Sequence, residues 1–241
     1  MRTLVIGDIH GGLRALEQVI EKVRPAANDH FIFLGDYVDG WSEAAETVSF
    51  LIHFSETHRC TFVRGNHDYL VHRHLRYGNK NQQWLDHGGA ASRDSYANLS
   101  SEEKEKHILF YEGLTNYHID KHNRLFVHAG FTNLKGPQYE HFENLVFWDR
   151  TLWEMAKSLD QSILKNSFRY PERLKLFSEI YIGHTALTKI GSTIPVNYAN
   201  LWNIDTGAAF TGPITILDVD TKEFWQSEPV RQLYPDERGR N

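Results

Sequence analysis

The sequence predicts an α/β fold in which two mixed β-sheets pack together and helices cover their outer faces. The first part of the chain alternates short apolar segments with helical patterns, which favours parallel strands joined by helical crossovers. The second part is richer in strands and hairpin signals, which favours mixed pairing. A chain of 241 residues, of which 41% are hydrophobic, is long enough to bury the core of one such domain.

Seven apolar segments are predicted as strands. Each is short and contains β-branched or aromatic residues. The segments are residues 3–7, 30–35, 60–65, 124–130, 179–184, 201–205 and 213–219. The stretch DVDTKEF, residues 218–224, is expected to form a hairpin turn.

Three segments between these strands have helical signals. Residues 13–24 place apolar side chains on one face of a helix. Residues 42–56 begin at Ser42, which has the side chain of an N-cap. Ser100 and Glu103 have the spacing of a capping box ahead of a third helix.

Composition and charge disfavour some classes of function. A net charge of −5 and a pI of about 6.3 leave no overall basic surface for nucleic acid. No stretch approaches the ~18 consecutive apolar residues of a membrane span. The single cysteine, Cys60, excludes an internal disulfide and fits a reducing compartment, so we expect a cytoplasmic protein. The 14 histidines, by contrast, indicate metal or acid–base chemistry.

Polar groups flanked by glycine follow five of the predicted strands. They are GDIHGG (7–12), GDYVDG (35–40), RGNHD (64–68), VHAG (127–130) and IGHT (182–185). The carboxyl ends of parallel strands gather at one edge of a sheet, and glycine lets the backbone approach a ligand closely. A single Asp or His after a strand is usually a helix cap or a surface residue, but five such groups in this order predict a shared site.

The side chains that these groups bring to the edge have the chemistry of metal ligands. In chain order they are Asp8, His10, Asp36, Asn66, His128 and His184. Carboxylate, amide oxygen and imidazole together suit hard and borderline divalent cations. Their number indicates two ions about 3.5–4 Å apart, with Asp36 as the shared carboxylate. With Asp36, the first site would consist of Asp8 and His10, and the second of Asn66, His128 and His184.

The series GDIHG, GDYVDG, GNHD, HAG and GHT resembles the signature of calcineurin-like metallophosphoesterases, and it is closest to the PPP branch. Two further stretches, WLDHGGAASRDSY (84–96) and NIDTGAAFTGPITILDVD (203–220), resemble segments of the bacterial enzymes of that branch. The resemblance implies a four-layer α/β/β/α metallophosphoesterase sandwich and the same six ligands. We expect one domain over residues 1–241, with a small helical cap-like insertion at about 69–112.

His67 follows the ligand Asn66 and is expected to face the substrate. Beside two cations it needs a carboxylate partner to remain a useful proton donor; Asp39 is the candidate, and the resemblance pairs the same two positions. We assign His67 as general acid for the leaving group or stabiliser of the transition state, with Asp39 orienting it. The alternatives are that His67 only fills space and that Asp39 is an ordinary turn residue. Asp68 is expected to cap a helix that begins at Tyr69.

The resemblance also implies arginines that hold the phosphoryl group, because a planar guanidinium matches phosphate oxygens. Arg150 in VFWDRTLW takes the position of one of them, unless it is a surface arginine paired with Glu154. The other is missing, because the PPP motif GDYVDRG is GDYVDGW here and Gly40 replaces its arginine. Trp41 either offers an aromatic face at the rim or packs inside. Candidates to compensate for the lost arginine are Arg64, Arg76 and Arg93.

We therefore expect a two-metal phosphoesterase that hydrolyses phosphomonoesters with a metal-activated water. The leading expectation is a serine/threonine protein phosphatase acting on phosphorylated protein, with Mn²⁺ as the expected metal, although Fe and Zn²⁺ suit the same ligands. The alternative is a symmetric dinucleoside polyphosphate hydrolase, in which Trp84 and neighbouring tyrosines hold a base of diadenosine tetraphosphate. These aromatic residues can equally be packed inside a cap.

Two other classes of function are disfavoured. A nuclease of the same fold conflicts with the acidic pI and the lack of a basic stripe. A non-catalytic scaffold conflicts with the presence of all six ligand positions and of the His67–Asp39 pair.

Overall fold

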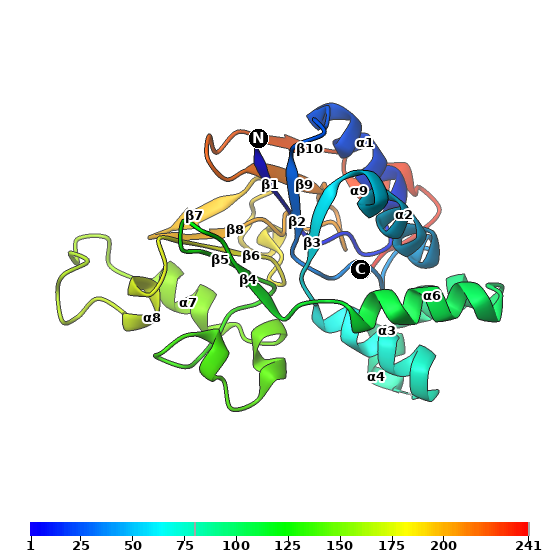
Figure 1. Cartoon of the computed structure of the whole chain (residues 1–241), viewed down its shortest axis with the longest axis horizontal. Coiled ribbons are helices and arrows are strands. Elements are labelled where there is room, and N and C mark those ends of the chain that lie inside the picture. The colour runs from blue at the N-terminus through cyan, green and yellow to red at the C-terminus, as the bar shows by residue number, and fades with distance from the viewer. Residues whose placement is uncertain (80, 241) are drawn as a thin grey trace.

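The computed structural model describes residues 1–79 and 81–240. Within these residues the strands form two five-stranded sheets, which pack against each other and have helices on their outer faces (Figure 1). This arrangement confirms the predicted fold class, two mixed sheets flanked by helices.

The first sheet has the strand order β10-β9-β1-β2-β3. Its strands β1, β2 and β3 are parallel, whereas β9 runs antiparallel to β1 and β10 antiparallel to β9. Their bounds are β1 Thr3–Ile6, β2 His30–Phe33, β3 Arg59–Phe62, β9 Thr215–Asp218 and β10 Phe224–Gln226. The β9–β10 hairpin contains the turn expected within residues 218–224.

The second sheet has the strand order β4-β5-β6-β8-β7. Here β5, β6 and β8 are parallel, and the two edge strands β4 and β7 are antiparallel to their neighbours. Their bounds are β4 Tyr117–Ile119, β5 Arg124–Val127, β6 Glu179–Ile182, β7 Val196–Tyr198 and β8 Leu201–Asn203.

The helices fall into three groups along the chain. Two cover the first sheet, α1 Leu13–Val23 and α2 Ala44–Thr57. The segment between β3 and β4 contains α3 Asn66–Tyr77, α4 Gln82–Trp84, the kinked π-helical segment η1 Leu85–Gly89, α5 Ala90–Ala97 and α6 Ser101–Glu112. The remaining ones are the 3₁₀ helices η2 Pro137–Tyr139, η3 Glu143–Phe147 and η4 Leu187–Ile190, with α7 Thr151–Ser158, α8 Glu172–Lys175 and α9 Val230–Leu233.

Both faces of the central strands are buried. In β1, Leu4 and Ile6 pack in the cluster that contains α1 and α2, whereas Val5 packs between the two sheets. In β5, Leu125 packs with side chains of α7, and Phe126 packs between the sheets. Successive side chains of a strand point to opposite faces, so each strand is held from both sides. The loops that follow these strands therefore start from rigid positions.

The helix signals were correct in part. Helix α1 lies where the apolar pattern predicted it, and the Ser100–Glu103 capping box is present at the start of α6. Ser42 does not cap α2, because the helix begins two residues later and Ser42 instead donates to Glu237 at 2.7 Å.

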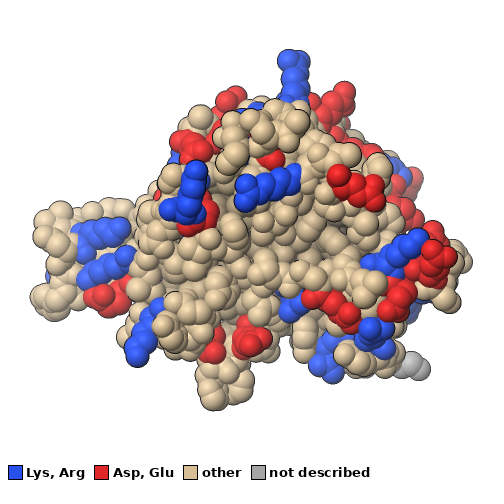
Figure 2. All heavy atoms as spheres, viewed as in Figure 1, with Lys and Arg blue, Asp and Glu red and all other residues tan. Residues whose placement is uncertain are grey.

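Surface charge is mixed. On the face seen in Figure 2, lysines and arginines are interspersed with aspartates and glutamates and form no continuous basic stripe. Among the described residues, no helix has the length and apolar character that crossing a membrane requires.

Candidate active site

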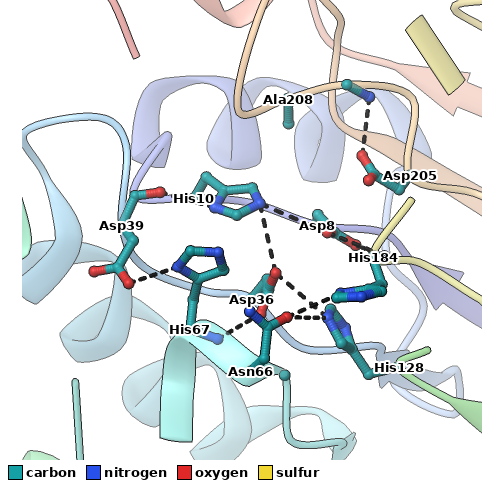
Figure 3. Close-up of polar contacts among 12 residues, drawn as sticks. Asp8, His10, Asp36, Asp39, Asn66, His67, His128, His184, Asp205 and Ala208 are labelled. Carbon is teal, nitrogen blue, oxygen red and sulfur yellow. Dashed lines mark hydrogen bonds and ion pairs between the residues drawn. The ribbon is translucent and has the colours of Figure 1, made fainter. Parts of the chain in front are cut away.

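The six predicted metal ligands meet at the carboxyl ends of β1, β2, β3, β5 and β6 (Figure 3). All of them are buried, although each is polar: Asp8, His10, Asp36, Asn66, His128 and His184. Their side chains form two groups in which the ligand atoms lie within 4.8 Å of one another, Asp8–His10–Asp36 and Asp36–His128–His184. The chain therefore assembles, from separate strand ends, two clusters with the chemistry to hold divalent cations.

Asp36 belongs to both clusters. Its Oδ2 atom lies 3.7 Å from Nε2 of His10 and 3.3 Å from Nε2 of His128. In the first cluster, Oδ2 of Asp8 is 3.6 Å from Nε2 of His10. Asn66 adds its amide oxygen to the second cluster, 2.9 Å from Nδ1 of His184. Asp36 therefore lies between the two clusters, where a carboxylate shared by two ions has to lie.

The imidazoles are oriented as metal-binding histidines usually are. Nδ1 of His10 lies 2.8 Å from the carbonyl oxygen of Asp39, and Nδ1 of His128 lies 2.8 Å from that of Leu34. A backbone carbonyl on one ring nitrogen fixes the tautomer and leaves the other nitrogen as a ligand. Nε2 of His184 is buried and has no hydrogen-bond partner among the described residues. This unsatisfied nitrogen atom and the clustered carboxylates fit a pair of divalent cations.

Electrostatics also favours cations here. Burial opposes ionisation of Asp36, but the neighbouring histidines, His128 foremost, hold its pKa well below the usual range. Burial by itself would lower the pKa of His128, yet the carboxylates around it, Asp36 above all, raise that pKa to about 9. A buried site that stabilises protonated imidazole is one in which negative charge is in excess.

The backbone at the site adopts a rare conformation. His10, Asp36, Asp39 and His184 all have φ between 54° and 71°, in the left-handed region. Non-glycine residues rarely occupy this region, and they remain there where the surrounding structure holds them. Glycine is required at position 183, where an added Cβ would lie 2.1 Å from Oδ1 of Asp8.

His67 and Asp39 lie beside the clusters and contact each other. Nδ1 of His67 is 2.7 Å from Oδ2 of Asp39, and both residues are buried. The indole N–H of Trp84 donates to the same carboxylate oxygen at 2.7 Å. Asp39 therefore holds an imidazole and an indole together, which is more than a turn residue does. The Trp84 contact had no local signal, because the two residues are 45 positions apart.

Two buried aspartates of the site were misjudged or missed from the sequence. Asp68 is not an N-cap, since α3 begins at Asn66; its carboxylate instead accepts the backbone N–H groups of Asp36 and Gly65, each at 2.8 Å. Asp205, which follows β8, was not singled out, although it follows a strand as Asp8 does. Burial, together with the Asp8 carboxylate, raises its pKa to about 7.

A pocket of about 340 Å³ opens onto this site. Its lining includes His67, Arg150, Trp148, Leu70 and Trp84. Arg150 precedes α7 and is exposed to the pocket side, while Glu154, its expected partner as a surface arginine, pairs with Lys157 instead.

At the altered motif GDYVDGW, the structure decides between the two alternatives for Trp41 and does not bring the three candidate arginines to the pocket. Trp41 is completely buried and donates to the carbonyl oxygen of Ala208 at 2.8 Å, so it packs inside and offers no face to the rim. The three arginines expected to compensate for Gly40 do not line the pocket. Their side chains bond elsewhere: Arg64 to Asn116, Arg76 to Glu105 and Arg93 to Asp94.

Residues 1–197 match the family model described as "Calcineurin-like phosphoesterase". The chain belongs to this family. Enzymes of the family use a dinuclear metal site, and the two clusters described above are the candidate for it. The chain is therefore a metal-dependent phosphoric ester hydrolase, and the resemblance seen in its motifs is confirmed.

The chain is similar to named proteins over most of its length. It is 25% identical over 239 residues to a bis(5'-nucleosyl)-tetraphosphatase, PrpE [asymmetrical], of Oceanobacillus iheyensis, covering 93% of this chain and 91% of that protein. Among solved structures, a candidate diadenosine tetraphosphatase superposes with a TM-score of 0.61 at 16% identity, covering 93% of this chain and 92% of that one. A serine/threonine phosphatase from Saccharomyces cerevisiae superposes with a TM-score of 0.59 at 14% identity, covering 95% and 80%. At these identities the structural likeness shows the fold.

Proposed function

We propose that this calcineurin-like phosphoesterase hydrolyses dinucleoside tetraphosphates asymmetrically, to a nucleoside monophosphate and a nucleoside triphosphate. The observation that carries the proposal is the lining of the pocket. It combines candidate metal ligands and Arg150 with apolar and aromatic side chains. The similarity to asymmetrical tetraphosphatases over nearly the whole length supports the same substrate class. This reverses our sequence-based preference for a protein phosphatase and replaces the symmetric cleavage of our alternative.

The aromatic side of the pocket has a place for a base. Trp148 lines the pocket and is 41% exposed, so part of its ring is free for stacking. Trp84 is 3% exposed and holds Asp39, so it acts in the wall of the pocket, and Leu70 adds apolar surface beside it. Base–aromatic stacking contributes about 1–3 kcal/mol per base, which a phosphorylated peptide would not gain.

The ligand clusters, Arg150 and His67 would each have a separate role in hydrolysis. When bound by the two clusters, divalent cations would supply an activated water and neutralise charge on the phosphoryl oxygens. Arg150 would hold the phosphate chain from the pocket side with its guanidinium. His67, with Nδ1 fixed at Asp39, would present Nε2 to the oxygen of the leaving group and donate its proton there.

The test compares two substrates side by side. Purified protein with Mn²⁺, and a chelator-treated control, is given diadenosine tetraphosphate or a phosphothreonine peptide, and products are separated by ion-exchange chromatography. We expect AMP and ATP in equal amounts and a kcat/KM for the dinucleotide that exceeds the peptide value by more than tenfold. Two molecules of ADP would overturn the asymmetrical cleavage, and preference for the peptide would overturn the substrate class.

A variant tests whether Trp148 stacks on a base of the substrate. Trp148→Ala should lower kcat/KM for the dinucleotide by about 10–100-fold, as expected for the loss of one stacked base. Hydrolysis of p-nitrophenyl phosphate, which has no base, should change far less. Tyr139→Ala, which alters another exposed aromatic residue that does not line the pocket, is the matched control.

A further inference from the structure

Gly40 stands where the PPP motif has a phosphate-binding arginine, so the chain lacks a guanidinium at that position. Gly40 has φ of 136°, a conformation that L side chains rarely adopt, so the backbone here is built for glycine. A phosphate chain with several negative charges gains from more than one guanidinium. The structure shows a second arginine at the pocket, and it comes from the last described segment of the chain.

Arg240 lines the pocket together with Arg150. Its aliphatic stem lies over two glycines: a Cβ added at Gly40 would be 3.4 Å from Cγ of Arg240, and one added at Gly88 would be 3.0 Å from the same atom. The main chains of the two glycines also contact each other, with the N–H of Gly40 donating to the carbonyl oxygen of Gly88 at 3.2 Å. The two glycines thus leave the space that the Arg240 stem fills.

The segment that carries Arg240 is fixed by the residue that follows Gly40. Trp41 donates to the carbonyl oxygen of Ala208, stacks on Tyr234 with ring centroids 5.3 Å apart, and would touch any Cβ added at Gly239. The N–H of Arg240 then donates to the carbonyl oxygen of Ala209 at 2.8 Å. The Gly-Trp pair therefore does two things, since glycine opens the space and tryptophan anchors the segment that fills it.

One nitrogen of the Arg240 guanidinium lacks a hydrogen-bond partner among the described residues. Nε of Arg240 is buried and makes no hydrogen bond within the described residues, and its Cζ lies 5.6 Å from the ring centroid of Phe210. Leaving a buried charged donor unsatisfied is costly. An anion in the adjoining pocket would satisfy it, because a guanidinium pairs with phosphate oxygens through two parallel hydrogen bonds.

We propose that Arg240 is a phosphate-binding residue of the pocket and takes over the role of the arginine that the PPP motif carries at position 40. The proposal rests on the phosphoester hydrolase function and deepens it. With Arg150, Arg240 would hold the phosphate chain of the substrate from a second direction. The substrate class that benefits is one with several linked phosphates.

The test measures binding of inorganic phosphate by isothermal titration calorimetry, to protein loaded with Mn²⁺ and to chelator-treated protein. Arg240→Gln keeps the aliphatic stem over Gly40 and Gly88 but removes the charge. We expect phosphate to bind it about 10–100-fold more weakly than it binds the wild type. Arg231→Gln removes the same charge from an exposed position on α9, outside the pocket lining. This variant should bind phosphate as the wild type does.

Metal content and melting temperature of Arg240→Gln should match those of the wild type, which separates phosphate binding from packing. Unchanged phosphate affinity in Arg240→Gln would overturn the proposal, and so would a loss of affinity that is equal in Arg231→Gln. The proposed substrate can fail separately: if the wild type does not cleave diadenosine tetraphosphate but Arg240→Gln still binds phosphate weakly, the substrate is wrong and Arg240 stands.

Discussion

The His67–Asp39 pair is the contact on which the proposed proton transfer depends. Nδ1 of His67 lies 2.7 Å from Oδ2 of Asp39, and the backbone N–H of His67 donates to Oδ1 of Asp36 at 3.0 Å. The ring is thereby fixed beside the metal clusters without belonging to either of them. Burial lowers the pKa of His67, although Asp36 and Asp39 oppose this effect. A role as proton donor therefore depends on both carboxylates.

Replacing His67 by Asn tests this role. The variant keeps the backbone contact to Asp36 and all six proposed ligands, so we expect metal content by elemental analysis to stay unchanged. Without the donor, kcat should fall by about 10²–10⁴. His53→Asn, at an exposed position, should leave kcat as it is. A normal rate for His67→Asn would reduce the residue to a space-filling one.

Among the secondary structure elements, the parallel pair β1–β2 has the most direct bearing on the site, because Asp8 and Asp36 follow these two strands. A buried carboxylate holds the amino-terminal end of the pair. Asp29, just before β2, accepts hydrogen bonds from the backbone N–H and the guanidinium of Arg2, just before β1. Burial opposes the ionisation of Asp29, but these bonds and the N–H of Ala26 lower its pKa to about 2.

This pair predicts a pH-dependent stability. The pKa of Asp29 is lower in the folded than in the unfolded chain. The contribution of its ionised carboxylate to the free energy of unfolding is therefore complete above about pH 4 and is lost as pH falls to about 2. Asp29→Asn should lower the free energy of unfolding at pH 7 by about 1–2 kcal/mol, less than the full shift implies because Arg2 is 30% exposed.

Urea denaturation from pH 7 to pH 2 provides the measurement. The difference in unfolding free energy between Asp29→Asn and the wild type should shrink between pH 4 and pH 2. Asp236→Asn, at an exposed position, should stay within about 0.5 kcal/mol of the wild type at every pH. A difference for Asp29→Asn that is constant over this range would show that the carboxylate charge does not matter.

For the molecule as a whole, metal binding and stability should be linked. The two clusters bring the carboxylates of Asp8 and Asp36 together with three imidazoles at the carboxyl ends of the strands, and these groups are assembled only in the folded chain. A ligand that binds only the folded state stabilises it by about 2.7 kcal/mol at a concentration of 100 Kd. In a chain of this size that corresponds to about 5–10 °C in melting temperature.

Calorimetry of chelator-treated protein, titrated with Mn²⁺, tests this link. The melting temperature of the wild type should rise by about 5–10 °C as metal is added. Asp36→Asn removes the carboxylate that belongs to both clusters, so this variant should lose most of the rise and all turnover. If the wild type does not respond to Mn²⁺, Zn²⁺ or Fe²⁺, or if Asp36→Asn responds fully, the assignment of the shared carboxylate is wrong.

The amino-acid sequence by itself determined the fold class and the series of candidate ligands. Strands such as β1 and β5 are recognisable because three consecutive residues in each, 4–6 and 125–127, are buried and apolar. A polar residue next to such a strand is conspicuous, and parallel strands collect these residues at one edge. The local pattern thus carried the information for Asp8, Asp36 and His128.

Tertiary structure alone decided the features that join distant parts of the chain. The edge strands β4, β7 and β10 were not predicted, because three residues are too few to show an apolar run or an alternation of their own. Trp41 meets Ala208 across 167 positions, and Arg240 reaches Gly40 by the same return of the chain. No short stretch encodes such contacts, since they form only when the hydrophobic core has brought both segments together.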